Sequence, residues 1–148
     1  MGATRATGLR DVRVVLDTNT VLSALLFPRG RLVWIQELWS AGRILPLVSR
    51  ATTRELIDAL AYPKFELGEN EIQTVLAAYL PFTEAVDVDD DLVVDIPACS
   101  DPADQMFLRL AGVGDAEVRV SGDRAMLALA GSTRFAVETV GQFQKRFG

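Results

Sequence analysis

Histidine is absent from this sequence of 148 residues, and cysteine occurs only once. Without histidine, the chain cannot use a Ser-His-Asp or Cys-His mechanism and offers no histidine ligand to zinc. The single Cys99 excludes an intrachain disulfide and any metal site built from several cysteines. Carboxylates are the main reactive groups that remain, so clusters of acidic residues are the first candidates for a site.

Long apolar runs are also missing. The apolar stretch 18–28 is too short to span a bilayer, and the first ten residues lack the apolar segment of a signal peptide. We therefore expect a cytoplasmic protein that does not contact a membrane. With 49% hydrophobic and 24% charged residues, the composition is that of a globular protein. We expect residues 1–11 to form a flexible tail and residues 12–148 to form a single domain.

The charge is acidic overall, with 15 basic and 20 acidic residues and a formal net charge of −5. This balance argues against a protein that holds a polyanion through its bulk charge. It leaves room for a nucleic acid that is bound through a few local basic residues or through cations.

Short apolar runs and helical periodicities alternate along the chain. The pattern predicts strands at 12–16, 44–48 and 117–120, with weaker ones at 83–88 and 92–96. It predicts helices from 18 to about 27, and over 32–42, 51–61, 69–80, 101–111, 125–129 and 140–147. This alternation is typical of an α/β sandwich with a mostly parallel sheet. The helical spacing of Trp34 and Trp39 favours the core or a partner interface over base stacking, and both options also remain open for the helix 69–80.

Two acidic residues follow predicted strands. Asp17 comes directly after the strand 12–16, and Asp123 comes shortly after the strand that ends at Val120. Ligands of open α/β sheets bind at the carboxyl ends of the strands, so both carboxylates are expected at one edge of the sheet. The alternative is that each residue simply caps the helix that follows it.

Two further acidic residues lie on predicted helices. Asp104 shares a helical stripe with Phe107, Leu108 and Ala111, which places its carboxylate at or inside the rim of the core. A carboxylate in that position needs a cation or a base as partner. Glu55 lies at the edge of an apolar helix face, where a surface role and a functional role are equally compatible with the pattern.

Four acidic residues without histidine or cysteine nearby favour a site for a hard cation. Mg²⁺ and Mn²⁺ prefer carboxylate oxygens and retained water. Such an ion would relieve the repulsion between the carboxylates and could activate a water for attack on phosphorus.

Four motifs in this order resemble the PIN domain family, and more narrowly its members described as toxin components of toxin–antitoxin systems. They are Asp17-Thr18-Asn19 after a strand, Ser49 through Glu55, Asp101-Pro102-Ala103-Asp104, and Ser121-Gly122-Asp123-Arg124. Together they span most of the chain.

The resemblance implies a three-layer α/β/α sandwich and a Mg²⁺- or Mn²⁺-dependent endoribonuclease. It assigns the acidic quartet to Asp17, Glu55, Asp104 and Asp123, a small hydroxyl residue to Ser121, and a polar residue that supports the first acid to Asn19. It also implies an RNA substrate, a small protein antitoxin and a homodimer. The third acid could instead be Asp101, which otherwise caps the helix. Ala103, Gln105 and Ala125 stand where many relatives carry further acids, so auxiliary metal ligands remain open.

Five arginines near these motifs are candidates for contacts with RNA phosphates, each with a plain surface role as the alternative: Arg29, Arg31, Arg50, Arg54 and Arg124. Two other functions are considered. A PIN-like binding or scaffold module is disfavoured by the intact quartet. An aspartyl-phosphate phosphatase is disfavoured because Asn19 stands where such enzymes need a second acid.

Overall fold

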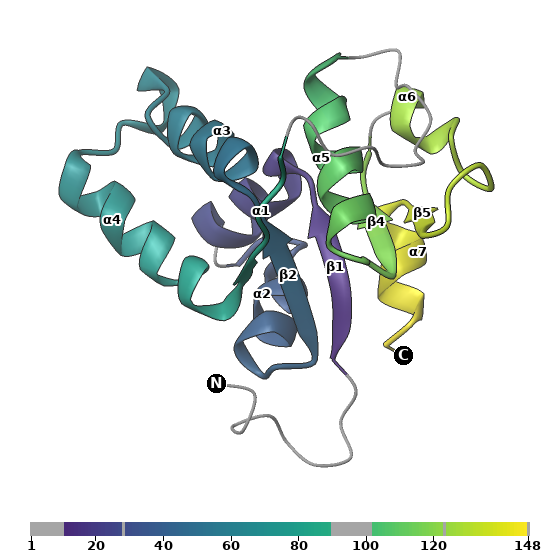
Figure 1. Cartoon of the computed structure of the whole chain (residues 1–148). Helices are drawn as coiled ribbons and strands as arrows, with labels where there is room; N and C mark the ends of the chain where they lie inside the picture. Colours follow the sequence, from purple (N-terminus) through teal and green to yellow (C-terminus); the bar gives the residue numbers. More distant parts are fainter. Residues whose placement is uncertain (1–10, 28, 90–101, 123, 148) are drawn as a thin grey trace.

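A five-stranded sheet forms the centre of the protein (Figure 1). The computed structural model describes residues 11–27, 29–89, 102–122 and 124–147. The strands lie in the order β3-β2-β1-β4-β5, and each neighbouring pair is parallel. Their bounds are β1 Val12–Leu16, β2 Ile44–Val48, β3 Glu84–Ala85, β4 Val118–Val120 and β5 Ala136–Glu138.

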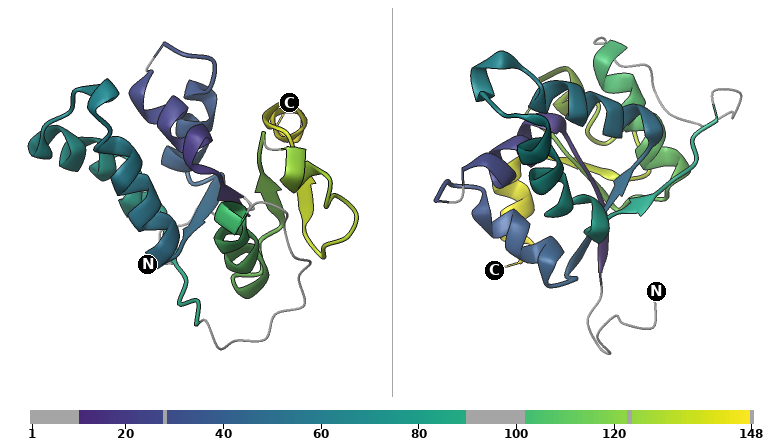
Figure 2. Two further views of the ribbon diagram at one scale, coloured as in Figure 1. Left: turned by 90° about the horizontal axis from the view of Figure 1, so that it is seen from above. Right: turned by 90° about the vertical axis from the view of Figure 1, so that its left-hand side faces the viewer.

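Helices cover both faces of this sheet. One core cluster joins Val14 and Leu16 to α1 (Thr18–Leu26), α2 (Val33–Ser40), α3 (Arg50–Leu60) and α7 (Val140–Lys145). A second cluster joins Val15 to α5 (Pro102–Val113) and α6 (Arg124–Leu127). Figure 2 shows α5 on one side of the strands and α1 with α2 on the other. The predicted three-layer α/β/α sandwich is therefore confirmed.

The helix α4 (Glu69–Ala77) runs back beside α3, and the two form a hairpin that projects from the sheet (Figure 1). Its apolar side chains Ile72, Val75 and Leu76 are partly buried against the first core cluster, which favours core packing. The sequence pattern predicts this helix as far as residue 80, but it ends earlier. Pro81 lacks the amide hydrogen that a continuing helix needs, and the chain forms the short 3₁₀ helix η3 (Leu80–Phe82) instead.

The sequence pattern does not predict β5, which is the main error of the strand assignment. Its three residues are too few to show an alternating pattern. The strand exists because β4 offers a free edge, along which Val118 pairs with Ala136 and Val120 with Glu138. The strand predicted at 92–96 lies outside the described residues.

The order in which strands are added to the sheet changes side between β1 and β4. From β1 the chain moves through β2 to β3 on one side, and it returns to add β4 and β5 on the other side. The carboxyl ends of β1 and β4 therefore lie at a topological switch point, where open α/β sheets bind their ligands. In the described part of the chain, no helix is long and apolar enough to cross a membrane.

Candidate active site

Asp17 directly follows β1 and lies at the switch point. Its Oδ1 accepts a hydrogen bond of 2.9 Å from the backbone N–H of Thr20. Asp17 therefore caps α1, which is the alternative role that the sequence predicts beside a place in a ligand site. Its Oδ2 accepts a longer bond of 3.5 Å from the N–H of Gly122, which follows β4. The capping role and a place in the site are thus compatible, because the carboxylate joins the ends of two neighbouring strands.

Glu55 reaches the same region from α3. The helix begins right after β2 because Ser49 caps it, with reciprocal bonds of 3.2 and 2.9 Å between Ser49 and Thr52. The side chain of Glu55 is half-buried, and its Oε2 accepts a hydrogen bond from the hydroxyl of Thr18. A neutral hydroxyl fixes the orientation of the carboxylate and leaves its charge uncompensated. This contact between α1 and α3 favours a role in the site over a plain surface role.

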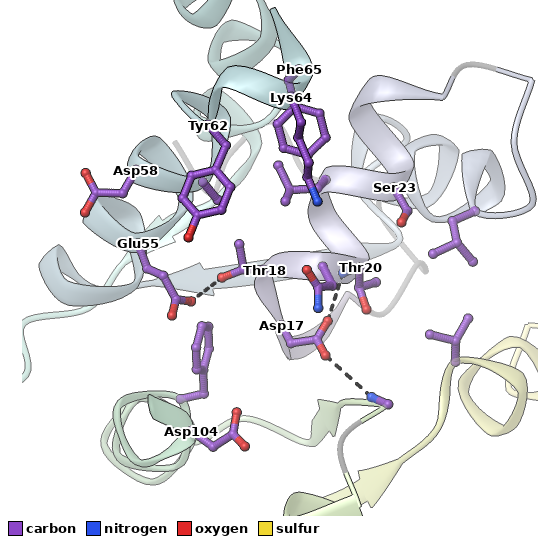
Figure 3. Close-up of a pocket in the computed structure, with 17 residues that line it drawn as sticks. Asp17, Thr18, Thr20, Ser23, Glu55, Asp58, Tyr62, Lys64, Phe65 and Asp104 are labelled. Carbon is purple, nitrogen blue, oxygen red and sulfur yellow. Dashed lines mark hydrogen bonds between the residues drawn. The ribbon is translucent and has the colours of Figure 1, made fainter. Parts of the chain in front are cut away.

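Asp104 lies in the first turn of α5. One turn further, Phe107 and Leu108 are 4% and 0% exposed, whereas Asp104 is half-buried. The predicted stripe is therefore correct, and its polar end lies at the rim of the core. Figure 3 shows the carboxylates of Asp104, Asp17 and Glu55 around the same end of a pocket.

The three acidic residues line one cleft with a volume of about 840 Å³. A fourth acidic residue in the cleft, Asp58, is exposed, and its carboxylate points away from the other three in Figure 3. The opposite wall carries Tyr62, Lys64 and Phe65, which follow α3. The cleft therefore combines an acidic end with an aromatic and basic rim.

The remaining quartet member, Asp123, and the alternative third acid, Asp101, lie outside the described residues. Asn19 lines the cleft and is exposed. The two hydrogen bonds to Asp17 that are described above come from the backbone N–H groups of Thr20 and Gly122, and not from the side chain of Asn19. Ser121 is fully buried at the end of β4, where its N–H donates to the carbonyl of Glu138.

The candidate arginines do not gather at the acidic cleft. Arg50 and Arg54 line a second, neighbouring cleft of about 1250 Å³, together with Arg109 of α5. Arg31 lines a third pocket beside α7, and Arg29 is exposed. The side chain of Arg124 lies outside the described part. Arg31, Arg50 and Arg54 thus line other pockets than the acidic one, and their contact with RNA phosphates stays a prediction.

The buried cation Arg119 is a feature that the sequence patterns did not single out. It lies in β4, is 0% exposed and places its guanidinium 4.7 Å from the centroid of the Phe107 ring. Its Nη1 donates to the carbonyl of Val120 at 2.7 Å. Phe107 itself lines the acidic cleft, so the buried guanidinium contacts a residue of the cleft wall. An arginine in the middle of an apolar strand was the signal that could have revealed it.

The donor chemistry of the cleft fits a hard divalent cation. Asp17, Glu55 and Asp104 offer carboxylate oxygens only, and Mg²⁺ is commonly held by one or two carboxylates and several waters. Among the described residues, no group of three or more aspartate, glutamate, histidine or cysteine side chains lies close enough together to hold a metal ion. The fit therefore rests on the kind of donor atoms in the cleft, which are carboxylate oxygens.

Fold and site together define the class: a parallel α/β protein with an acidic cleft at the switch point of its sheet. The chain belongs to the PIN domain family, whose model matches residues 13–125. The family resemblance of the four motifs is therefore confirmed.

The chain is also similar to individual proteins. Protein MJ1680 of Methanocaldococcus jannaschii is 27% identical over 127 residues, which cover 84% of this chain and 79% of that protein. The crystal structure of VapBC2 from Rickettsia felis, bound to a DNA fragment from its promoter, matches with a TM-score of 0.57. That match has 13% identity and covers 86% of this chain and 98% of the other, so it supports the fold. PAE2754 from Pyrobaculum aerophilum matches with a TM-score of 0.48 and 16% identity, over 95% and 92% of the two chains.

Proposed function

We propose that this protein is a Mg²⁺- or Mn²⁺-dependent endoribonuclease and the toxin of a toxin–antitoxin pair. The observation that carries the proposal is the meeting of Asp17, Glu55 and Asp104 in one cleft, although they come from three separate elements. PIN domains are a nuclease family. The chain has no histidine, so hydrolysis by histidine acid–base catalysis is not available to it.

Each acid has a proposed role. Asp17 and Asp104 would hold the ion, Asp123 would bind it directly or through water, and Glu55 would bind it or position the attacking water. Thr18 keeps Glu55 in orientation through its hydroxyl. A bound divalent ion would supply a water of lowered pKa and a positive charge beside the scissile phosphate. The side chains that the protein itself contributes would thus be carboxylates, which hold the ion or position the water.

The substrate and partners are part of the proposal. An RNA strand would enter the acidic cleft, and the arginine-lined cleft with Arg50, Arg54 and Arg109 would hold its continuation. The two clefts share Asp58 as a lining residue, so they lie next to each other on α3. We propose a cytoplasmic homodimer that is held inactive by a small antitoxin. The structure of VapBC2, a protein with the same fold, is consistent with such a partner.

The direct test of the function is cleavage of RNA with and without metal. Purified protein is expected to cut a mixed-sequence RNA at internal positions in millimolar Mn²⁺ or Mg²⁺, and to lose this activity when EDTA removes the ion. Products are resolved on a denaturing gel. Equal cleavage in EDTA would contradict the metal mechanism, and intact RNA at all metal concentrations would contradict the ribonuclease.

Metal binding is expected to raise the melting temperature even without RNA. An ion that binds only the folded protein stabilises it by about 2.7 kcal/mol at a concentration one hundred times the dissociation constant. For a chain of this size, that corresponds to a rise of roughly 5–10 °C. Differential scanning fluorimetry with Mn²⁺, and with Na⁺ at matched ionic strength as control, measures it. The absence of any shift in millimolar Mn²⁺ would favour the scaffold module over the enzyme.

A further inference from the structure

The rim of the acidic cleft exposes an aromatic side chain that core packing does not explain. Tyr62 is 60% exposed, more than the other large apolar residues exposed in the described part, Phe27, Ile57 and Phe82. It lines the same cleft as the carboxylates, and its hydroxyl end points toward Glu55 in Figure 3. A ring exposed to this extent gains free energy when a ligand removes it from water.

The backbone holds this ring in a defined place. The N–H of Tyr62 donates to the carbonyl of Ala59 at 3.2 Å, and its own carbonyl accepts from Phe65 at 3.1 Å. Pro63 follows directly and begins the 3₁₀ helix η2 (Pro63–Phe65). Since proline restricts the backbone and both backbone groups of Tyr62 are bonded, little freedom remains except about the side chain. The ring is a preformed surface at the end of α3.

A positive charge accompanies the ring. Lys64 is exposed, and its Nζ lies 5.1 Å from the centroid of the Phe65 ring. Among the described residues that line the cleft, it is the one cation beside four carboxylates. A ligand that fits both Tyr62 and Lys64 must offer a flat apolar face for the ring and, next to that face, a negative charge for the ammonium group. A single-stranded nucleic acid has this combination in each nucleotide.

We propose that Tyr62 is a stacking platform for one unpaired base next to the scissile phosphate, and that Lys64 contacts the phosphate beside that base. The inference rests on the proposed ribonuclease function and adds two residues of the chain that would contact its substrate, Tyr62 and Lys64. Bases within a duplex are stacked on their neighbours, so a platform of this kind selects single-stranded regions. Stacking on an aromatic ring tolerates all four bases, so Tyr62 contributes affinity without choosing a sequence.

The test measures binding separately from cleavage. Binding of a fluorescein-labelled unpaired RNA is followed by anisotropy in Mn²⁺, with the Asp104→Asn protein as the parent so that the RNA stays intact. Adding Tyr62→Ala is expected to raise the dissociation constant about 10-fold or more, because a lost base–aromatic stack has effects of this size. Tyr62→Phe keeps the ring and should stay within about 3-fold of the parent. Phe27→Ala, at a similarly exposed aromatic outside this cleft, is the matched control.

A second arm identifies what the ring touches. A series of RNAs with a single abasic position is bound to the parent and to the Tyr62→Ala protein. One abasic position should weaken binding to the parent but should not weaken binding to the Tyr62→Ala protein any further. The reason is that the base and the ring form one interaction, which is already lost when either partner is removed. Equal binding by the Tyr62→Ala protein and its parent overturns the platform. So does loss of binding in Tyr62→Phe, or the absence of any coupled base.

The outcomes separate the platform from the enzyme. If RNA binding depends on the ring of Tyr62 but the wild-type protein cleaves no RNA, the stacking platform stands and the proposed function is refuted. If the wild-type protein cleaves RNA but Tyr62→Ala leaves the RNA affinity unchanged, the proposed function stands and the stacking platform is refuted. A protein that binds no RNA overturns both.

Discussion

Replacing Asp17 by asparagine is expected to abolish metal-dependent RNA cleavage while the protein stays folded. Asparagine is as good a helix cap as aspartate, so it can still accept the hydrogen bond from Thr20 and begin α1. It loses the negative charge that the ion requires. Losing only a second-sphere partner of a metal ligand costs about 10- to 100-fold in affinity or activity, so losing the ligand itself should cost at least about 100-fold.

The equivalent change at Asp104 should have the same effect for a different structural reason. Asp104 is half-buried at the end of an apolar stripe, so an uncharged amide is easier to accommodate there than a carboxylate. The folded state should therefore be kept or slightly stabilised. We expect loss of cleavage by at least about 100-fold together with a weaker Mn²⁺ effect on the melting temperature.

The matched control for both variants is Asp58→Asn. Asp58 lines the same cleft but is exposed, and its carboxylate points away from the other acids (Figure 3). Initial cleavage rates in Mn²⁺, with circular dichroism as the check on folding, should separate the three proteins. Wild-type rates in both Asp17→Asn and Asp104→Asn would refute the mechanism, and an equal loss in Asp58→Asn would show a general charge effect.

The largest expected loss of stability follows from removing the ring of Trp39. This residue is 1% exposed, its Nε1–H donates to the carbonyl of Ala78 at 3.0 Å, and its ring packs edge-on against Tyr79 at 4.8 Å. It therefore ties α2 to the chain that follows α4. Trp39→Ala should lower the free energy of unfolding by about 3–5 kcal/mol, since the cavity remains largely unfilled. The melting temperature should fall by roughly 6–20 °C.

Urea unfolding followed by circular dichroism measures this loss without using tryptophan fluorescence. Trp39→Phe keeps most of the packing but leaves the carbonyl of Ala78 without its indole donor, so an intermediate loss is expected. Trp34→Ala is the control, because Trp34 is half-buried and packs at 6.1 Å against Phe143. A loss in Trp34→Ala as large as in Trp39→Ala would contradict the assignment of Trp39 as the main contact of this core.

Most of the elements could be predicted because their signals are local. The strand Val12–Leu16 and the helix after it follow from an apolar run, a capping aspartate and a break at Pro28. β5 could not be predicted, since its three residues form a strand only because β4 lies beside them. The early end of α4 is a different case, because Pro81 is a local signal in the sequence that outweighs the continuing apolar periodicity.

The candidate site divides in the same way. The place of Asp17 at the end of a strand and that of Asp104 at the rim of the core follow from local patterns, and the structure brings both into the acidic cleft. The arginines could not be placed, because proximity in sequence does not say which side of α3 a residue occupies. Arg50 and Arg54 therefore lie in the neighbouring cleft.

The sequence by itself determined which side chains are available for a site: without histidine and with one cysteine, carboxylates are the main candidate metal ligands. It also determined the local caps and periodicities that make an α/β chain. Only the tertiary structure decided which groups act together. The hydroxyl of Thr18 meets Glu55 across 37 positions of sequence, Arg119 lies behind Phe107, and Tyr62 stands across the cleft from Asp104. Such contacts depend on how the helices pack on the sheet, and side-chain packing between distant segments leaves no periodic trace in the sequence.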